Sequence, residues 1–157
     1  MKMKLLILFV AVASALSSTF AQTPDLITAA RSNDVNLAKT LLDAKADVNQ
    51  RDDKGYTPLI LATYDGNFEV AQFLLQHGAS TEIKDNSGRT ALMGAAFKGN
   101  EREVKLLLDH GANAAASDSK GMTSMMYAVM FARISVIKEL RAGEAVKTAT
   151  SQVSSTR

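Results

Sequence analysis

The 157 residues of this sequence include no cysteine, so the chain can form neither disulfide bonds nor a lipid-modified N-terminal cysteine. Its stability must therefore come from packing. Only two histidines, His77 and His110, could serve as general bases or imidazole ligands. No serine stands in a Gly-x-Ser-x-Gly sequence, and the glycines form no cluster that could cradle a phosphate group. These absences predict no catalytic residue, no metal site and no cofactor.

An excess of one charge sign is also lacking, with 18 Lys and Arg against 16 Asp and Glu. Two of the positive charges, Lys2 and Lys4, lie in the first 21 residues, which contain no acidic residue. The rest of the chain is therefore formally neutral. A neutral domain has no overall attraction for a polyanion, so we expect no nucleic acid partner.

Long apolar runs are absent except near the N-terminus, where Lys2 and Lys4 precede an apolar stretch at residues 5–12 and small residues that end at Ala21. This order is typical of a cleaved secretory signal peptide, which we predict at residues 1–21. The apolar stretch is too short to span a bilayer comfortably, so no membrane anchor is expected after cleavage. The predicted location is the bacterial periplasm, with secretion as the alternative.

What the sequence does contain is a repeat of 33 residues. One register holds Gly55, Gly88 and Gly121, each followed two residues later by Thr57, Thr90 and Thr123. A second register holds Ala29, Ala62, Ala95 and Ala128. A period of this length indicates small units that stack on one another to bury their apolar faces. The registers place units at about residues 25–51, 52–84, 85–117 and 118–143, of which the first is a half unit. The alanines are expected where neighbouring helices approach too closely for larger side chains.

The unit at residues 52–84 shows how each unit is built. Asp52 and Gly55 predict a turn, because the Asp side chain can bond the turn backbone and glycine tolerates a positive φ. Thr57 and Pro58 then predict the start of a first helix, as its N-cap and its first helical residue. The turn recurs in both following units, the unit at residues 85–117 repeats the whole plan, and the unit at residues 118–143 is degenerate.

A second helix is predicted at residues 68–76, with Asn67 as its N-cap and Gly78 as the residue that ends it. His77 and His110 each precede such a terminal glycine. A histidine there interacts favourably with the helix C-terminus, so both are interpreted as structural residues.

Gly-Tyr-Thr-Pro-Leu at residues 55–59, Gly66-Asn67, and His77-Gly78-Ala79 with its echo at residues 110–112 resemble the ankyrin repeat. The resemblance covers about residues 25–143. It implies an all-α solenoid of about four helix–turn–helix units joined by β-hairpin-like loops, with a concave surface of loop tips and first helices. Lys45 in place of a closing glycine and Ser124 in place of proline are departures typical of end units. We assign residues 22–143 to this domain and expect the apolar-poor residues 144–157 to be a disordered tail.

Four methionines cluster in the last unit: Met122, Met125, Met126 and Met130. Exported methionine-rich segments can bind Cu(I) through their thioethers, but gap filling in an irregular end unit is the favoured interpretation. Met125 falls in register with Leu59 and Leu92, so it is expected in the core.

Side chains at the loop tips and on the outer side of each first helix are free to bind a partner. The predicted partner-binding residues are Arg31, Tyr64, Phe97, Met130, Asp65, Lys98 and Phe131 on the first helices, and Tyr56, Lys54, Arg89 and Met122 at the tips. Aromatic residues and arginine carry much of the energy at interface hot spots. Alternatively, Tyr64 and Phe97 pack against the neighbouring hairpin as ordinary packing.

Taken together, the sequence favours an exported, non-enzymatic protein–protein interaction module, expected to be a monomer, that binds or protects another exported protein. A secreted effector or inhibitor that acts on a host or competitor protein is the alternative. An enzyme or a metal carrier is a third class, disfavoured by the missing nucleophiles, ligands and cofactor loops.

Overall fold

A computed structural model describes residues 24–155, with side chains described through residue 144. The predicted signal peptide lies outside the described residues. Within them, the chain forms helices and one isolated antiparallel bridge between Ser117 and Thr123. The helices pair in chain order as α2 (Leu26–Ser32) with α3 (Val35–Asp43), α4 (Pro58–Asp65) with α5 (Phe68–Gln76), α6 (Ala91–Lys98) with α7 (Glu101–Asp109), and α8 (Ser124–Met130) with α9 (Ile134–Ser155).

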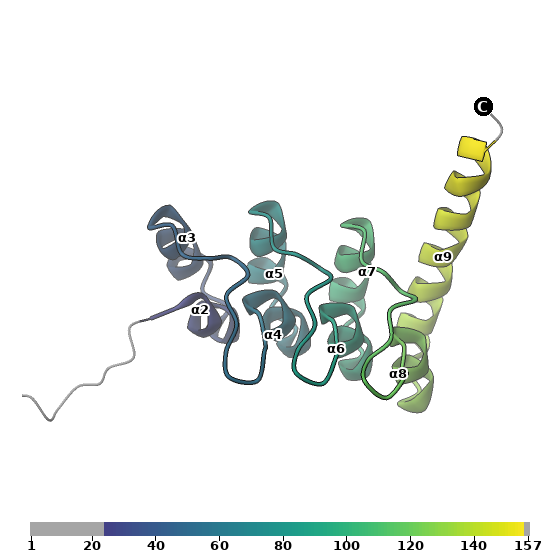
Figure 1. Ribbon diagram of the computed structural model, residues 1–157, viewed down its shortest axis with the longest axis horizontal. Helices are drawn as coiled ribbons and strands as arrows, with labels where there is room; N and C mark the ends of the chain where they lie inside the picture. The colour runs from purple at the N-terminus through teal and green to yellow at the C-terminus, as the bar shows by residue number, and fades with distance from the viewer. Residues whose placement is uncertain (1–23, 156–157) are drawn as a thin grey trace, which may run out of the picture.

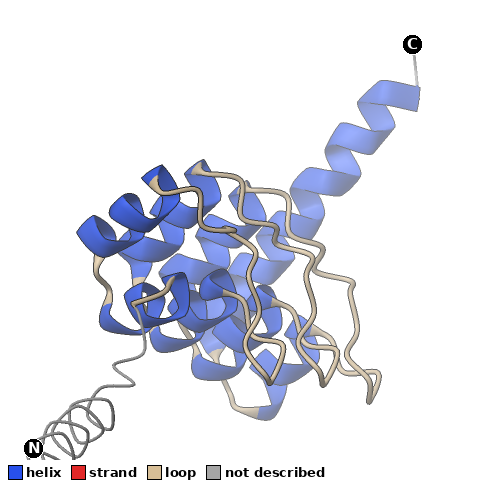
Figure 2. Ribbon diagram, turned by 60° about the vertical axis from the view of Figure 1, so that its left-hand side comes forward, coloured by secondary structure: helices blue, strands red, loops and turns tan. Residues whose placement is uncertain are grey.

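The four helix pairs stack side by side into a solenoid (Figure 1). The first helices α2, α4, α6 and α8 form one row and the second helices form the other, while the hairpin-like loops project together on one side (Figure 2). The predicted all-α fold of four helix–turn–helix units is confirmed. The first unit, however, is a complete helix pair and not a half unit. Asp25 and Asp34 supply the N-caps there, since their carboxylates accept from the backbone N–H groups of Thr28 and Leu37.

The predicted helix starts and turns have the expected local bonds. Thr57 Oγ1 accepts from Ile60 N at 3.2 Å, and Thr90 and Thr123 repeat this bond one and two units later. The turn residue Asp52 accepts from two backbone N–H groups of its own hairpin, as do its counterparts in the next two units. Lys45 keeps the left-handed conformation of the glycine it replaces, with φ of 68°.

Asn67 lies at the N-cap position, but the predicted capping bond is wrong. Its side-chain amide donates instead to the carbonyl oxygens of Ala30 and Arg31 in the preceding unit, at 2.7 and 3.2 Å. Asn100 bonds the preceding unit in the same way. The last carbonyls of a helix lack partners within it, so a donor from the next unit satisfies them. These asparagines therefore join neighbouring units.

Neighbouring first helices meet across the alanine row. Ala29, Ala62, Ala95 and Ala128 are completely buried, which agrees with their expected position at the closest approach of the helices. Met125 is half-buried and packs against this core.

The predicted disorder of the tail is wrong for residues 144–155, because α9 continues to Ser155. This segment contains neither proline nor glycine. Extending a helix that already exists costs much less than nucleating one, and Val136 and Leu140 anchor the first turns of α9 in the core. None of the helices within the described residues combines the length and the apolar character needed to cross a membrane.

Candidate functional site

A pocket of about 250 Å³ opens on the concave surface where the hairpins meet the first helices. Its walls come from α4 and α6, from the hairpins before α4 and α6, and from one residue each of α2 and α8. The lining residues are Arg31, Tyr56, Ile60, Leu61, Tyr64, Asp65, Asp85, Arg89, Thr90, Met93, Gly94, Phe97 and Tyr127. Six of the predicted partner-binding residues meet there: Arg31, Tyr56, Tyr64, Asp65, Arg89 and Phe97.

Aromatic rings form a row along this surface because a 33-residue period places equivalent side chains side by side. The rings of Tyr64 and Phe97 stack with centroids 6.1 Å apart and planes 9° apart. Phe97 also contacts Phe131 edge-on at 4.6 Å and Tyr127 at 6.2 Å, and Lys98 Nζ lies 4.8 Å above the Tyr64 ring. Tyr64 and Phe97 are half-buried, so they pack against one another and still present ring surface to the pocket.

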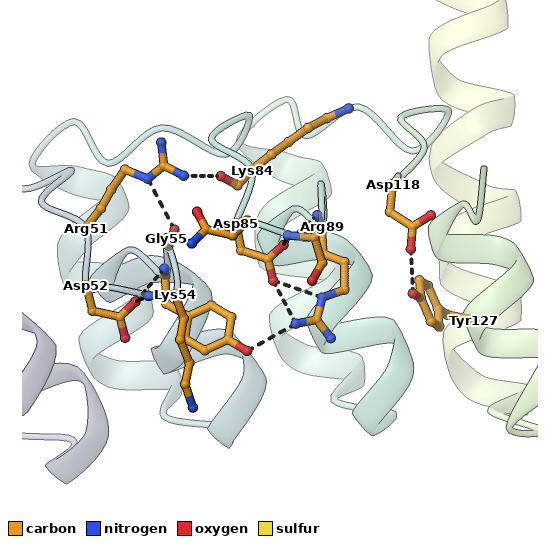
Figure 3. A network of polar contacts seen from close by, with 12 residues as sticks. Arg51, Asp52, Lys54, Gly55, Lys84, Asp85, Arg89, Asp118 and Tyr127 are labelled. Carbon is orange, nitrogen blue, oxygen red and sulfur yellow. Dashed lines mark hydrogen bonds and ion pairs between the residues drawn. The ribbon is translucent and has the colours of Figure 1, made fainter. Parts of the chain in front are cut away.

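The hairpin before α6 holds a partly buried ion pair beside the pocket (Figure 3). The Asp85 carboxylate, almost fully buried, accepts from Arg89 N and Nε at 2.9 Å each. Arg89 Nη2 lies 2.8 Å from Asp85 and donates to the Tyr56 hydroxyl at 3.1 Å. Burial disfavours the guanidinium charge, but the bonds and charge of Asp85 outweigh it and raise the pKa of Arg89. Arg89 therefore stays charged, is balanced by Asp85, and positions the ring of Tyr56.

Tyr127 is a pocket residue that the sequence analysis missed. Its hydroxyl donates to Asp118 Oδ2 at 2.7 Å (Figure 3). Burial opposes ionisation of Asp118, but the hydrogen bonds from Tyr127 and from the turn N–H groups of Met122 and Lys120 lower its pKa. Burial, and then the bond to Asp118, raise the pKa of Tyr127. The positions in register with Tyr127 are Leu61 and Gly94, neither of which indicates a polar contact. The only sign of one in the sequence was the turn residue Asp118.

The remaining predicted residues lie outside the pocket. Lys98 lies over the face of the Tyr64 ring. The carbonyl oxygen of Lys54 accepts from Asn86 N in the next hairpin at 3.1 Å. Met122 is half-buried in the last hairpin. Met130 and Phe131 are exposed at the C-terminal end of the helix row.

Both histidines have the predicted structural position. Nδ1 of His77 lies 2.8 Å from the carbonyl oxygen of Phe73, and Nδ1 of His110 lies 2.8 Å from that of Leu106. A carbonyl oxygen only accepts, so Nδ1 carries the proton in each ring. Within the described residues no group of three His, Cys, Asp or Glu side chains could hold a metal ion.

The model of a family described as ankyrin repeats (3 copies) matches the chain at residues 3–85, 26–115 and 78–150. No curated protein matches the sequence. The overlapping matches cover the four helix pairs as far as residue 150 of α9, including the hairpins and first helices that form the pocket.

Proposed function

Because this chain belongs to the ankyrin-repeat family, whose stacked units are protein–protein interaction modules, we propose that it binds and holds or protects another exported protein. The concave pocket between α4 and α6 carries this proposal. Four aromatic rings line it: Tyr56, Tyr64, Phe97 and Tyr127. Such a cluster suits the burial of an anchor side chain from a partner.

The size and charge of the pocket favour an apolar anchor on a protein. Its volume of about 250 Å³ is below the roughly 300–1,000 Å³ typical of small-molecule sites. Arg89 is balanced by Asp85, and Arg31 lies 3.8 Å from Asp52, so the positive charges at its edge are already paired. A large apolar or aromatic side chain is the occupant that this lining accommodates best.

A non-enzymatic role is supported by the way the titratable side chains are used. The histidines bond helix carbonyls, and the turn aspartates Asp52, Asp85 and Asp118 accept from the backbone of their own hairpins. Each has a structural partner that accounts for its presence.

Export is supported by the N-terminal order of lysines, apolar residues and small residues. We place the protein in the periplasm, and secretion as an effector or inhibitor of a host or competitor protein is the second candidate. Cell fractionation separates the two, since a periplasmic protein is released with the periplasmic fraction and a secreted one accumulates in the medium.

The test is a crosslinked pull-down from the exported fraction of the source cells, with the full chain expressed from its first residue. Two variants test whether the pocket binds the partner. Gly94→Leu fills it, because a Cβ at Gly94 lies at an ordinary contact distance of 3.5 Å from Tyr64 and Leu61 occupies the same register. Tyr64→Ala/Phe97→Ala empties it. The control, Lys105→Ala/Asp109→Ala, changes an exposed ion pair on the second helix α7.

A partner that the parent and the control capture, and that both pocket variants lose while their helical signal is retained, would support the proposal. Capture by all four proteins would place the binding surface elsewhere. If only the doubly truncated variant fails to bind and it also melts early, the loss reflects folding, because the Gly94→Leu variant still binds with its pocket filled.

A further inference from the structure

The C-terminal end of the solenoid exposes an apolar patch. Within residues 24–144, the large apolar side chains that are exposed all lie on α8, at its end, or at the first residue of α9: Met126, Val129, Met130, Phe131 and Ile134. We call these five residues the end patch. In Figure 1, α8 is the last of the row of first helices, and within the described residues no further helix pair stacks on it.

The 33-residue register shows what the end patch lacks. Met126 corresponds to Ile60 and Met93, which are 5% and 1% exposed, whereas Met126 is 50% exposed. Val129 corresponds to Thr63 and Ala96, which are both 0% exposed, whereas Val129 is 59% exposed. In the internal units these positions are buried with the following unit in place. The last unit keeps apolar residues there although they remain exposed among the described residues.

The second helix of the last unit is different. Glu139 and Arg141 of α9 stand in register with Leu106 and Leu108 of α7. A polar replacement of this kind is expected of a terminal unit that faces water. The end patch on α8 therefore remains apolar beside a helix that is already adapted to solvent.

The N-terminal end of the array is polar. Asp25 and Thr28 stand in register with Pro58 and Leu61, which are buried. Thr28 donates from both its backbone N and its hydroxyl to the Asp25 carboxylate, at 2.7 and 2.9 Å. If the end patch of one copy packed against the N-terminal end of another, it would remove these polar groups from water without offering them new hydrogen-bond partners. Head-to-tail stacking of two copies is thus disfavoured.

We propose that the end patch binds the end patch of a second copy of this chain, which gives a two-fold symmetric, tail-to-tail dimer. A two-fold interface brings the same surface together from both copies, and the end patch has no charged member that would meet its own equivalent. The adjoining cation, Arg133, donates from Nε to the carbonyl oxygen of Phe97 at 3.2 Å. Flexible methionines adapt readily to such a self-contact.

The area of the end patch suits a weak dimer. Exposed fractions of 42–62% on five side chains of roughly 150–200 Å² each come to about 500 Å² per copy. A pair would bury about 1,000 Å², the lower end for a specific interface, so we expect dissociation in about the micromolar range. This proposal differs from the monomer expected from the sequence. It does not depend on the proposed function.

Sedimentation measurements on the full chain, expressed from its first residue, test the proposal over about 1–200 µM. The parent should shift from one chain mass to twice that mass as concentration rises. Val129→Lys should weaken association at least about tenfold, because it would bury a charge without a partner. Ser32→Lys, an exposed position at the opposite end of the array, should leave it unchanged. A parent that stays monomeric throughout, or a dimer that Val129→Lys leaves intact, would overturn the proposal.

The absence of cysteine from the chain allows a second measurement of where copies meet. Single variants Met126→Cys, Val129→Cys and Met130→Cys place a thiol on the end patch, and Ser32→Cys serves as the control. Under mild oxidation, at least one end-patch variant should form covalent dimers much faster than the control. Equal rates, or faster crosslinking through Ser32→Cys, would refute a tail-to-tail contact.

Discussion

Changing Asn100 to aspartate distinguishes a bond between units from a cap within one unit. The substitution preserves the size and shape of the side chain and removes its N–H donors. If Asn100 acted only as an N-cap, aspartate would serve equally well, and its negative charge at the helix N-terminus would add about 0.3–1 kcal/mol of stability. The structure predicts the opposite result, because Asn100 Nδ2 donates to the carbonyl oxygens of Thr63 and Tyr64 at 2.9 and 3.0 Å.

The size of the loss follows from those two bonds. Each hydrogen bond contributes about 1 kcal/mol net, and an acceptor left unpaired in a part-buried site adds to the cost of losing it. An ionised carboxylate at the same place would also repel the two carbonyl oxygens. After subtracting the favourable dipole term, we expect Asn100→Asp to lower the free energy of unfolding by about 1–3 kcal/mol at pH 7.

Urea unfolding followed by far-UV circular dichroism measures this difference. Asn36→Asp is the matched control, since Asn36 is exposed in the first turn of α3 and its side chain makes no hydrogen bond to another unit within the described residues. It should be neutral or slightly stabilising through the helix dipole alone. If Asn100→Asp proved as stable as the parent, or more stable, the two hydrogen bonds between units would contribute nothing to stability, contrary to this prediction.

Three further predictions concern single sites. Ser124 Oγ is buried without a hydrogen-bond partner among the described residues, so Ser124→Ala should raise the free energy of unfolding by about 1 kcal/mol; a lower melting temperature would contradict this. Lys45 has a positive φ, so Lys45→Gly should stabilise by about 1 kcal/mol in urea unfolding, and a loss would show that the lysine side chain matters more. Folding lowers the pKa of Asp118. Its contribution to stability is therefore fully present at pH values above the ordinary Asp pKa, and it is lost as the pH falls through the lower pKa of the folded state. The raised pKa of Tyr127 means that its contribution is present at neutral pH and is lost as pH rises through the folded value. Tyr127→Phe should therefore flatten the dependence of stability on pH in both the acidic and the alkaline range. An unchanged pH profile would show that the hydrogen bond between Tyr127 and Asp118 does not contribute to stability.

The candidate site was predicted in part. Tyr64 and Phe97 were found because the repeat register aligns them, and the structure places both at the pocket. Met130 shares their register and Lys54 lies at a hairpin tip, but both lie outside the pocket, which is centred where α4, α6 and their hairpins meet. Tyr127 was missed because its register holds Leu61 and Gly94 in the earlier units, which gave no sign of a polar or aromatic role.

Local features could be predicted from the sequence alone because their partners lie a few residues away. Thr57 caps a helix by accepting from the backbone N–H three residues later. Asp52 accepts from the backbone N–H groups two and four residues later in its turn. Such contacts depend on short stretches of backbone and recur wherever the residues recur. The 33-residue period likewise determined the number of units and their order.

Tertiary structure decided everything that passes between units. Asn67 bonds carbonyls 36 and 37 residues before it, α9 extends to Ser155 from an anchor in the core, and α8 leaves Met126 and Val129 uncovered. Each depends on how one unit is placed against the next, which no residue pattern within a single unit specifies. The sequence by itself thus determined the repeated unit, and the stacking of the units decided which side chains join them, which form the pocket and which remain exposed.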